Sequence, residues 1–181
     1  GISDDIGATS TVISDNRRYI AYRAPQDASG NYGIYLSRDG GQTYTRRLYS
    51  TDLFRNVVSS RYSKYWIAQS GTYHNYGNVF VSQDFGNTWR QEVELSDNQN
   101  MKGVGISPGG KYMLYSSFSG FGTKYSTDYG TTFSDFNPGA GIVTTASGFA
   151  VSGNDEYGVI VDQFGWAWIT NDWVNFTAKD L

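Results

Sequence analysis

The 181-residue sequence contains no cysteine, one histidine and only three prolines. Without cysteine the chain has no disulfide framework, no thiolate nucleophile and no cysteine zinc site. A single histidine, His74, cannot form a histidine-rich metal site, and a general-base interpretation of it rests only on the ordinary imidazole pKa near neutrality. We therefore expect no metal and no cofactor.

Charge and long apolar runs are also scarce. Charged residues make up 17% of the chain, and the net charge of −3 includes no basic stripe, so nucleic-acid binding has little electrostatic support. No apolar run approaches the roughly 18 residues of a membrane-spanning helix. Aromatic residues (17%) and 22 glycines are abundant, which suits a single domain of many short strands and turns.

One eight-residue pattern recurs along the chain at a nearly constant interval. Its central aspartates are 45, 44 and 44 residues apart, and such a period predicts a repeat architecture. The copies, called box turns below, are SRDGGQTY at 37–44, SQDFGNTW at 82–89, STDYGTTF at 126–133 and the altered TNDWVNF at 170–176. The central aspartates are Asp39, Asp84, Asp128 and Asp172.

Each position of the box turn has a physical role. An aspartate carboxylate accepts hydrogen bonds from N–H groups a few residues on and closes a tight turn. A glycine two residues later adopts the positive φ that hairpin turns often need. The final aromatic residue supplies a large apolar ring for the core. We therefore interpret the four aspartates as structural.

The S-x-D-x-G-x-T-aromatic pattern resembles the Asp-box of sialidases, sortilin-like receptors and related β-propellers. The resemblance implies a β-propeller fold. It also implies that the box is a structural turn far from the ligand, so function has to be argued separately.

Each repeat contains four segments typical of strands. The second segment is a nearly continuous apolar run led by tyrosine, as in Tyr19–Tyr22 and Tyr65–Ala68, which indicates a strand covered on both faces. Small β-rich segments precede it, including Thr11–Ser14 and, in the last repeat, Ile142–Thr145. The predicted fold is all-β: a four-bladed β-propeller with four-stranded antiparallel blades and Asp-box turns between the third and fourth strands.

We predict one propeller domain over residues 1–181. Its blades are expected at about 11–52, 53–97, 98–136 and 137–181. Ile2–Asp4 resembles Leu95–Asp97 before the third blade, so residues 1–10 are expected to help close the ring. A closed ring of four is the simplest arrangement, and larger rings made by two chains or by further sequence stay open.

The loops between second and third strands are the predicted ligand face, opposite the box turns. An aromatic–glycine pair recurs in all four loops, and its ring either packs between blades or belongs to an exposed surface that stacks on sugars. Aromatic residues outside this pair have no packing role implied by the repeat. The candidate ligand-binding residues are Arg23, Tyr32, Tyr73, His74, Tyr76, Phe118, Phe121, Phe164 and Trp166.

Two features bear on an enzymatic alternative. Tyr22–Pro25 resembles the Phe/Tyr-Arg-Ile-Pro motif of sialidases, whose arginine binds the substrate carboxylate, but Arg23 is only 16 residues before Asp39 and sialidases have six blades. Glycoside hydrolysis needs two carboxylates that face one cavity. Asp27 and Asp162, from the first and last repeats, are the pair that ring closure would bring near each other.

The function predicted from these observations is a non-catalytic recognition module that binds a glycan or a surface protein. A sialidase-like or other glycoside hydrolase and a structural assembly module are the alternatives. The resemblance places the protein in an extracellular, cell-surface or virion-surface setting. Whether it forms a homo-oligomer or part of a larger assembly is left open.

Overall fold

The computed structural model describes residues 10–71, 77–95, 101–117, 122–136, 146–162 and 164–180. These residues form four antiparallel sheets of four strands each, with strand orders β1-β2-β3-β4, β5-β6-β7-β8, β9-β10-β11-β12 and β13-β14-β15-β16. No described residue belongs to a helix that could cross a membrane. The sheets are the blades of a β-propeller and are called blades 1 to 4 in chain order.

The strands of blades 1 and 2 are β1 (Thr11–Ile13), β2 (Ile20–Ala24), β3 (Tyr32–Ser37), β4 (Thr45–Ser50), β5 (Phe54–Ser59), β6 (Trp66–Gly71), β7 (Gly77–Ser82) and β8 (Arg90–Leu95). Those of blades 3 and 4 are β9 (Met101–Ile106), β10 (Met113–Ser117), β11 (Thr123–Ser126), β12 (Ser134–Asp135), β13 (Ala146–Val151), β14 (Gly158–Asp162), β15 (Trp166–Thr170) and β16 (Thr177–Asp180).

The sequence placed the first strand of blade 4 too early. Ile142–Thr145 lies outside the described residues, and the strand that pairs with β14 is Ala146–Val151, with Val151 opposite Gly158. The error arose because Gly148 interrupts the apolar pattern of β13. The turn after the strand identifies it, since Ser152 accepts the N–H of Tyr157 as Ser107 accepts that of Tyr112.

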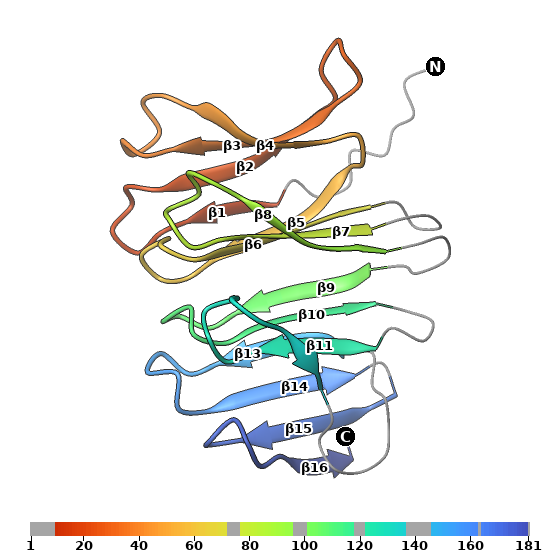
Figure 1. Cartoon of the computed structure of the whole chain (residues 1–181). Coiled ribbons are helices and arrows are strands. Elements are labelled where there is room, and N and C mark those ends of the chain that lie inside the picture. Colours follow the sequence, from red (N-terminus) through yellow and green to blue (C-terminus); the bar gives the residue numbers. More distant parts are fainter. Residues whose placement is uncertain are drawn as a thin grey trace.

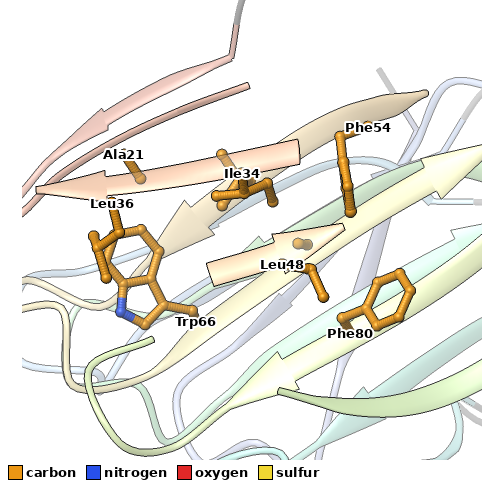
Figure 2. Close-up of a cluster of buried hydrophobic side chains, with 9 residues drawn as sticks. Ala21, Ile34, Leu36, Leu48, Phe54, Trp66 and Phe80 are labelled. Atoms are coloured by element: carbon orange, nitrogen blue, oxygen red, sulfur yellow. The ribbon is translucent and has the colours of Figure 1, made fainter. Parts of the chain in front are cut away.

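The blades pack face to face through three hydrophobic clusters. The cluster between blades 1 and 2 contains Ile34 and Leu36 on one side and Phe54, Trp66 and Phe80 on the other (Figure 2). Equivalent clusters join blade 2 to blade 3 and blade 3 to blade 4. Burial of these apolar side chains is the main stabilising contribution of the fold.

The four blades form a row in which each packs against its neighbours in sequence. Strands β1 to β3 contact β5, β5 and β6 contact β9, and β9 and β10 contact β13. Blade 1 and blade 4 lie at opposite ends of the molecule in Figure 1. The described residues therefore do not close the ring of four that was the simplest expectation, because the packing between neighbouring sheets does not bring blade 4 back to blade 1. Residues 1–9, which were expected to help close it, lie outside the described residues.

One glycine sets how closely blades 3 and 4 approach. A Cβ atom at Gly105 of β9 would lie 2.2 Å from Cδ1 of Phe149 in β13, whereas one at Gly103 has no atom within 4 Å. We expect Gly105→Ala to lower the free energy of unfolding by about 1–3 kcal/mol through overpacking. Gly103→Ala, on the same strand, should leave stability unchanged or raise it slightly. Urea denaturation of both variants checks this, and equal stabilities would contradict it.

The box turns connect the third and fourth strands and are held by local hydrogen bonds. In the second copy, Oδ1 of Asp84 accepts the N–H of Thr88 at 2.9 Å and the hydroxyl of Ser82 at 2.9 Å, and Oδ2 accepts the hydroxyl of Thr88 at 2.7 Å. The N–H of Gly86 donates to Oγ of Ser82 at 3.0 Å. The same bonds recur around Asp39 and Asp128.

These bonds stabilise the ionised aspartates. Bonds from the hydroxyl and N–H of Thr43 lower the pKa of Asp39 to about 2, and bonds from the N–H and amide of Asn175 lower that of Asp172 to about 2. Burial raises the pKa of Asp84 and Asp128, but the threonine bonds outweigh it and leave both below the ordinary value.

The lowered pKa values predict an acid-sensitive fold. An aspartate in the unfolded chain has a pKa of 3.8, so the turns contribute their full stability above about pH 4 and lose it as the pH falls toward 2. We expect the free energy of unfolding to be constant from pH 7 to about 5 and to decline steadily below pH 4. Urea titrations at a series of pH values measure this. A free energy that stays constant down to pH 2.5 would contradict the role of the carboxylates.

Candidate functional site

Each blade has two ends where functional side chains can lie. The loops between second and third strands form one end, called the loop end. The box turns and the turns between first and second strands form the other, called the turn end, which lies at the left of Figure 1. Five of the predicted ligand residues of the loop end lie outside the described residues: Tyr73, His74, Tyr76, Phe118 and Phe121.

Two of the four described candidates have a packing role. Tyr32 packs against the cluster between blades 1 and 2. Trp166 packs against the cluster between blades 3 and 4, and its ring centroid lies 6.4 Å from that of Trp168. For Tyr32 this is the packing alternative that the aromatic–glycine pair left open. Trp166 lies outside that pair, and its packing was not predicted from the repeat.

Arg23 joins two blades. Its Nη1 donates a hydrogen bond of 2.9 Å to the carbonyl oxygen of Phe54 in blade 2. The guanidinium is half-buried and lies on the face of β2 that packs against blade 2. This contact accounts for an arginine at position 23 without the carboxylate-binding role that the sialidase motif would imply.

Phe164 is an exposed ring on a fixed turn. It lies between β14 and β15 with 66% of its surface exposed. Oδ1 of the buried Asp162 accepts the N–H groups of Phe164 and Trp166, both at 2.9 Å, and thereby holds this turn. Phe164 is the described loop-end residue whose ring is most available to a ligand.

Asp27 has a similar structural role in blade 1. Its Oδ1 accepts the N–H groups of Ser29 at 2.8 Å and Asn31 at 3.0 Å, and its Oδ2 pairs with Arg46. The Asn31 bond, followed by the Arg46 bond, holds the pKa of Asp27 below its ordinary value. Asp27 follows β2 and Asp162 ends β14, and these strands lie at opposite ends of the molecule (Figure 1). The expectation that the two carboxylates of one chain face one cleft is therefore wrong, because blades 1 and 4 of the same chain do not meet.

A pocket at the turn end was not predicted from the sequence. It has a volume of about 350 Å³ and is lined by Ser60, Arg61, Tyr62, Lys64, Tyr65, Phe85, Pro108, Gly109 and Gly153. The lining comes from the turns between first and second strands of blades 2, 3 and 4 and from the box turn of blade 2. Among the lining residues, the available sequence signal was Lys64, a basic residue directly before the tyrosine Tyr65, as Arg18 is before Tyr19 and Lys111 before Tyr112.

Hydrogen bonds join the neighbouring turns around this pocket. The N–H of Asp15 donates to the carbonyl of Arg61 at 2.9 Å, and the N–H of Arg61 donates to the carbonyl of Pro108 at 2.7 Å. The N–H of Gly109 donates to the carboxylate of Asp155, at 2.9 Å to Oδ1. The turns of consecutive blades thus form one connected rim.

Aromatic rings from neighbouring blades stack at the turn end. The tyrosine directly before the second strand of a blade stacks on a box-turn residue of the next blade: Tyr19 on Phe85 at 5.5 Å and Tyr65 on Tyr129 at 4.7 Å between ring centroids. Phe85 adopts φ of 63° and Tyr129 also 63°, which aims each ring at the preceding blade. The ammonium of Lys64 lies 4.9 Å from the centroid of Tyr65.

The pocket combines cations with exposed rings. Tyr62 is 59% exposed and Phe85 is 36% exposed. Arg61 and Lys64 carry the positive charge of the pocket, and no carboxylate belongs to the lining residues. Nε of Arg61 forms an ion pair with Oδ2 of Asp15 at 3.1 Å. Such a surface can stack on the flat face of a sugar or aromatic group and pair with an anion or hydroxyl.

Comparison with known proteins supports the fold. No family model and no curated protein matches the chain. Among solved structures it is similar to the GH74 enzyme of Niastella koreensis (TM-score 0.63, 13% identity, 93% of this chain and 29% of that one). It is also similar to a chain of the nidogen/laminin complex (0.58, 12%, 94% and 63%) and to the Cps50 (Swd1) β-propeller domain of Myceliophteria thermophila (0.63, 8%, 96% and 55%). The chain thus spans less than two thirds of each of these proteins. They include an enzyme and proteins of other kinds, and at these identities the likeness shows the propeller fold alone.

Proposed function

We propose that this chain is a non-catalytic recognition module that binds a glycan at the turn-end pocket. The observation that carries the proposal is the lining of that pocket: two cations and three aromatic rings with no carboxylate, on a rim connected by hydrogen bonds. A sugar ring would stack on Tyr62, and Arg61 and Lys64 would pair with a carboxylate or hydroxyl group of the glycan. A volume of about 350 Å³ lies within the range of small-ligand sites, roughly 300–1,000 Å³.

The absence of catalysis in this proposal rests on how the carboxylates are used. Asp27 and Asp162 each hold a loop-end turn, and the box aspartates hold box turns. A glycosidase instead needs two carboxyl groups about 5–10 Å apart across a cleft. The resemblance of the box turns supports assigning the chain to the Asp-box propellers and to an extracellular, cell-surface or virion-surface setting.

The loop end is a second candidate surface because Phe164 is exposed on a turn that Asp162 holds rigid. Its ligand would be a glycan or a partner protein, since an exposed aromatic ring on a fixed loop suits either. The predicted ligand residues Tyr73 and His74 come between β6 and β7 in the sequence and lie outside the described residues.

A glycan array screen tests the proposal and separates the two ends. We expect selective binding, weakened about fivefold or more by Tyr62→Ala, because loss of a stacking ring costs about 1 kcal/mol or more. Phe164→Ala is the matched control: it removes an equally exposed ring from the opposite end and should leave binding unchanged.

The outcomes of this screen are distinct. If Phe164→Ala or Tyr73→Ala weakens binding and Tyr62→Ala does not, the ligand binds at the loop end. If no glycan binds, or if the chain hydrolyses chromogenic glycosides, the proposal of a non-catalytic glycan-binding module is wrong. Finding the native protein in the cytosol would overturn the proposed extracellular or surface setting.

A further inference from the structure

The first and last blades each present an apolar sheet face at an end of the row. On blade 1 this face, called the leading face, carries Ile13, Ile20, Tyr22, Tyr35 and Tyr44. On blade 4 the corresponding end, called the trailing face, carries Ala150, Val159, Val161, Ala167 and Ile169. Within the described part of the chain these two faces remain uncovered by a neighbouring blade, as Figure 1 shows.

The leading face is a cluster of partly exposed rings. The ring of Tyr22 stacks on Tyr35 at 5.6 Å and meets the edge of Tyr44 at 5.1 Å between centroids. Ile13 is 59% exposed and Tyr44 is 39% exposed. The opposite face of the same sheet carries Ala21, Ile34 and Leu36, which are almost fully buried against blade 2.

In the other three blades the equivalent residues pack against the preceding blade. The last aromatic residue of each box turn shows this, because Trp89, Phe133 and Phe176 pack on the clusters that blades 2, 3 and 4 share with blades 1, 2 and 3. Tyr44 occupies that position in blade 1. The pair Tyr22–Tyr35 likewise has the same register as Ala68–Phe80 and Ile160–Trp168.

The trailing face of blade 4 matches the residues that other blades bury against the following blade. Val159 has the position of Ala21 and Ile67, and Ile169 has that of Leu36 and Val81. Those four residues are 0–3% exposed, whereas Ile169 is 40% exposed and Val159 is half-buried. The two end faces therefore have the register of the two halves of an interface between blades.

We propose that a second copy of this chain covers both faces, with blade 4 of each copy packed on blade 1 of the other. The faces are complementary in size: small aliphatic residues on blade 4 would meet tyrosine rings on blade 1, as Ala21 and Leu36 share one cluster with Trp66 and Phe80 inside the chain. One two-fold axis makes both contacts at once, and the ring then closes with eight blades. This inference does not depend on the ligand proposed above.

Backbone hydrogen bonds between the turns of consecutive blades also follow the repeat. Asp15 and Arg61 donate their N–H groups to the turn of the next blade, at Arg61 and Pro108. Gly153 has the equivalent position in blade 4, one residue after Ser152, as Asp15 follows Ser14. The N–H of Gly153 would donate to the carbonyl of Asp15 in the second copy.

The proposed contact between two copies differs from the contacts between blades of one chain in its aromatic stacking. Phe85, Tyr129 and Trp173 stack on the preceding blade's tyrosine, at Tyr19, Tyr65 and Tyr112. The box turn of blade 1 has Gly40 there. Tyr157, which is 58% exposed, would thus stay exposed in the dimer.

Sedimentation equilibrium of the 181-residue chain tests the proposal. We expect a single species of twice the chain mass of 20.1 kDa. Ile13→Glu on the leading face and Ile169→Lys on the trailing face should each raise the dimer dissociation constant at least about thirtyfold, because each buries an unpaired charge. Val174→Lys is the control: this aliphatic residue of blade 4 is 78% exposed on its box turn and should leave the dimer intact.

A mixture of the Ile13→Glu and Ile169→Lys variants distinguishes a weakened interface from a general loss of folding. An Ile13→Glu chain paired with an Ile169→Lys chain has one unaltered contact and one that joins Glu to Lys. We expect the mixture to recover the mixed dimer. Circular dichroism of each variant confirms its fold. A chain that stays monomeric, as further blades of a longer chain covering these faces would require, contradicts the proposal. So does a larger or open-ended oligomer, or a dimer that neither substitution weakens.

Discussion

Trp66→Ala is expected to lower the free energy of unfolding by about 3–5 kcal/mol, the usual cost of removing a buried aromatic ring. Trp66 is fully buried between blades 1 and 2, where it faces Leu36 and Ala21 (Figure 2). Its Nε1 donates to the carbonyl of Ser63 at 2.6 Å, so the substitution also leaves a buried acceptor without its donor. For a chain of this length the melting temperature should fall by about 10 °C.

Urea denaturation followed by circular dichroism measures this effect. Trp66→Phe, which keeps most of the ring volume but not the indole N–H, should lose less than Trp66→Ala. Val174→Ala removes apolar atoms from a residue that is 78% exposed and should change stability by less than about 0.5 kcal/mol. A loss below about 1 kcal/mol for Trp66→Ala would show that the contact between blades 1 and 2 contributes little.

Asp84→Ala is expected to cost about 2 kcal/mol, because the second box turn loses charge-assisted hydrogen bonds from Ser82, Asn87 and Thr88. Asp84→Asn should cost less, since its amide oxygen can still accept the N–H of Thr88. Each Asp84 variant should also lose less stability than the native chain on acidification, because one of the carboxylates that titrate has been removed.

Asp135→Ala is the matched control for this change. Asp135 pairs with Lys124 at 2.5 Å, but its side chain is 77% exposed, and exposed ion pairs contribute about 0–1 kcal/mol. Thermal and urea unfolding of both variants make the comparison. Equal losses for Asp84→Ala and Asp135→Ala would mean that the box aspartate acts only as a surface charge.

The sequence alone predicted those parts of the fold that are stabilised by contacts between residues close in the chain. The box turns close through bonds between residues two to four positions apart, such as Ser37 to Asp39 and Thr43 to Asp39. The order of the strands within each sheet follows from these turns and from apolar runs such as Trp66–Ala68. Both kinds of signal are short in sequence, so the repeat predicted four antiparallel blades correctly.

Only the tertiary structure shows how the four blades pack against one another and where this packing places the candidate site residues. Asp27 and Asp162 were paired on the assumption that blade 4 meets blade 1, yet the blades form a row. Arg23 bonds to Phe54 across a blade boundary, and the turn-end pocket gathers residues from three blades. These outcomes depend on the rotation between neighbouring sheets, which is set by the packed volumes of side chains far apart in sequence. The strand pattern records which face of a sheet is apolar, but not the angle at which the next sheet covers it.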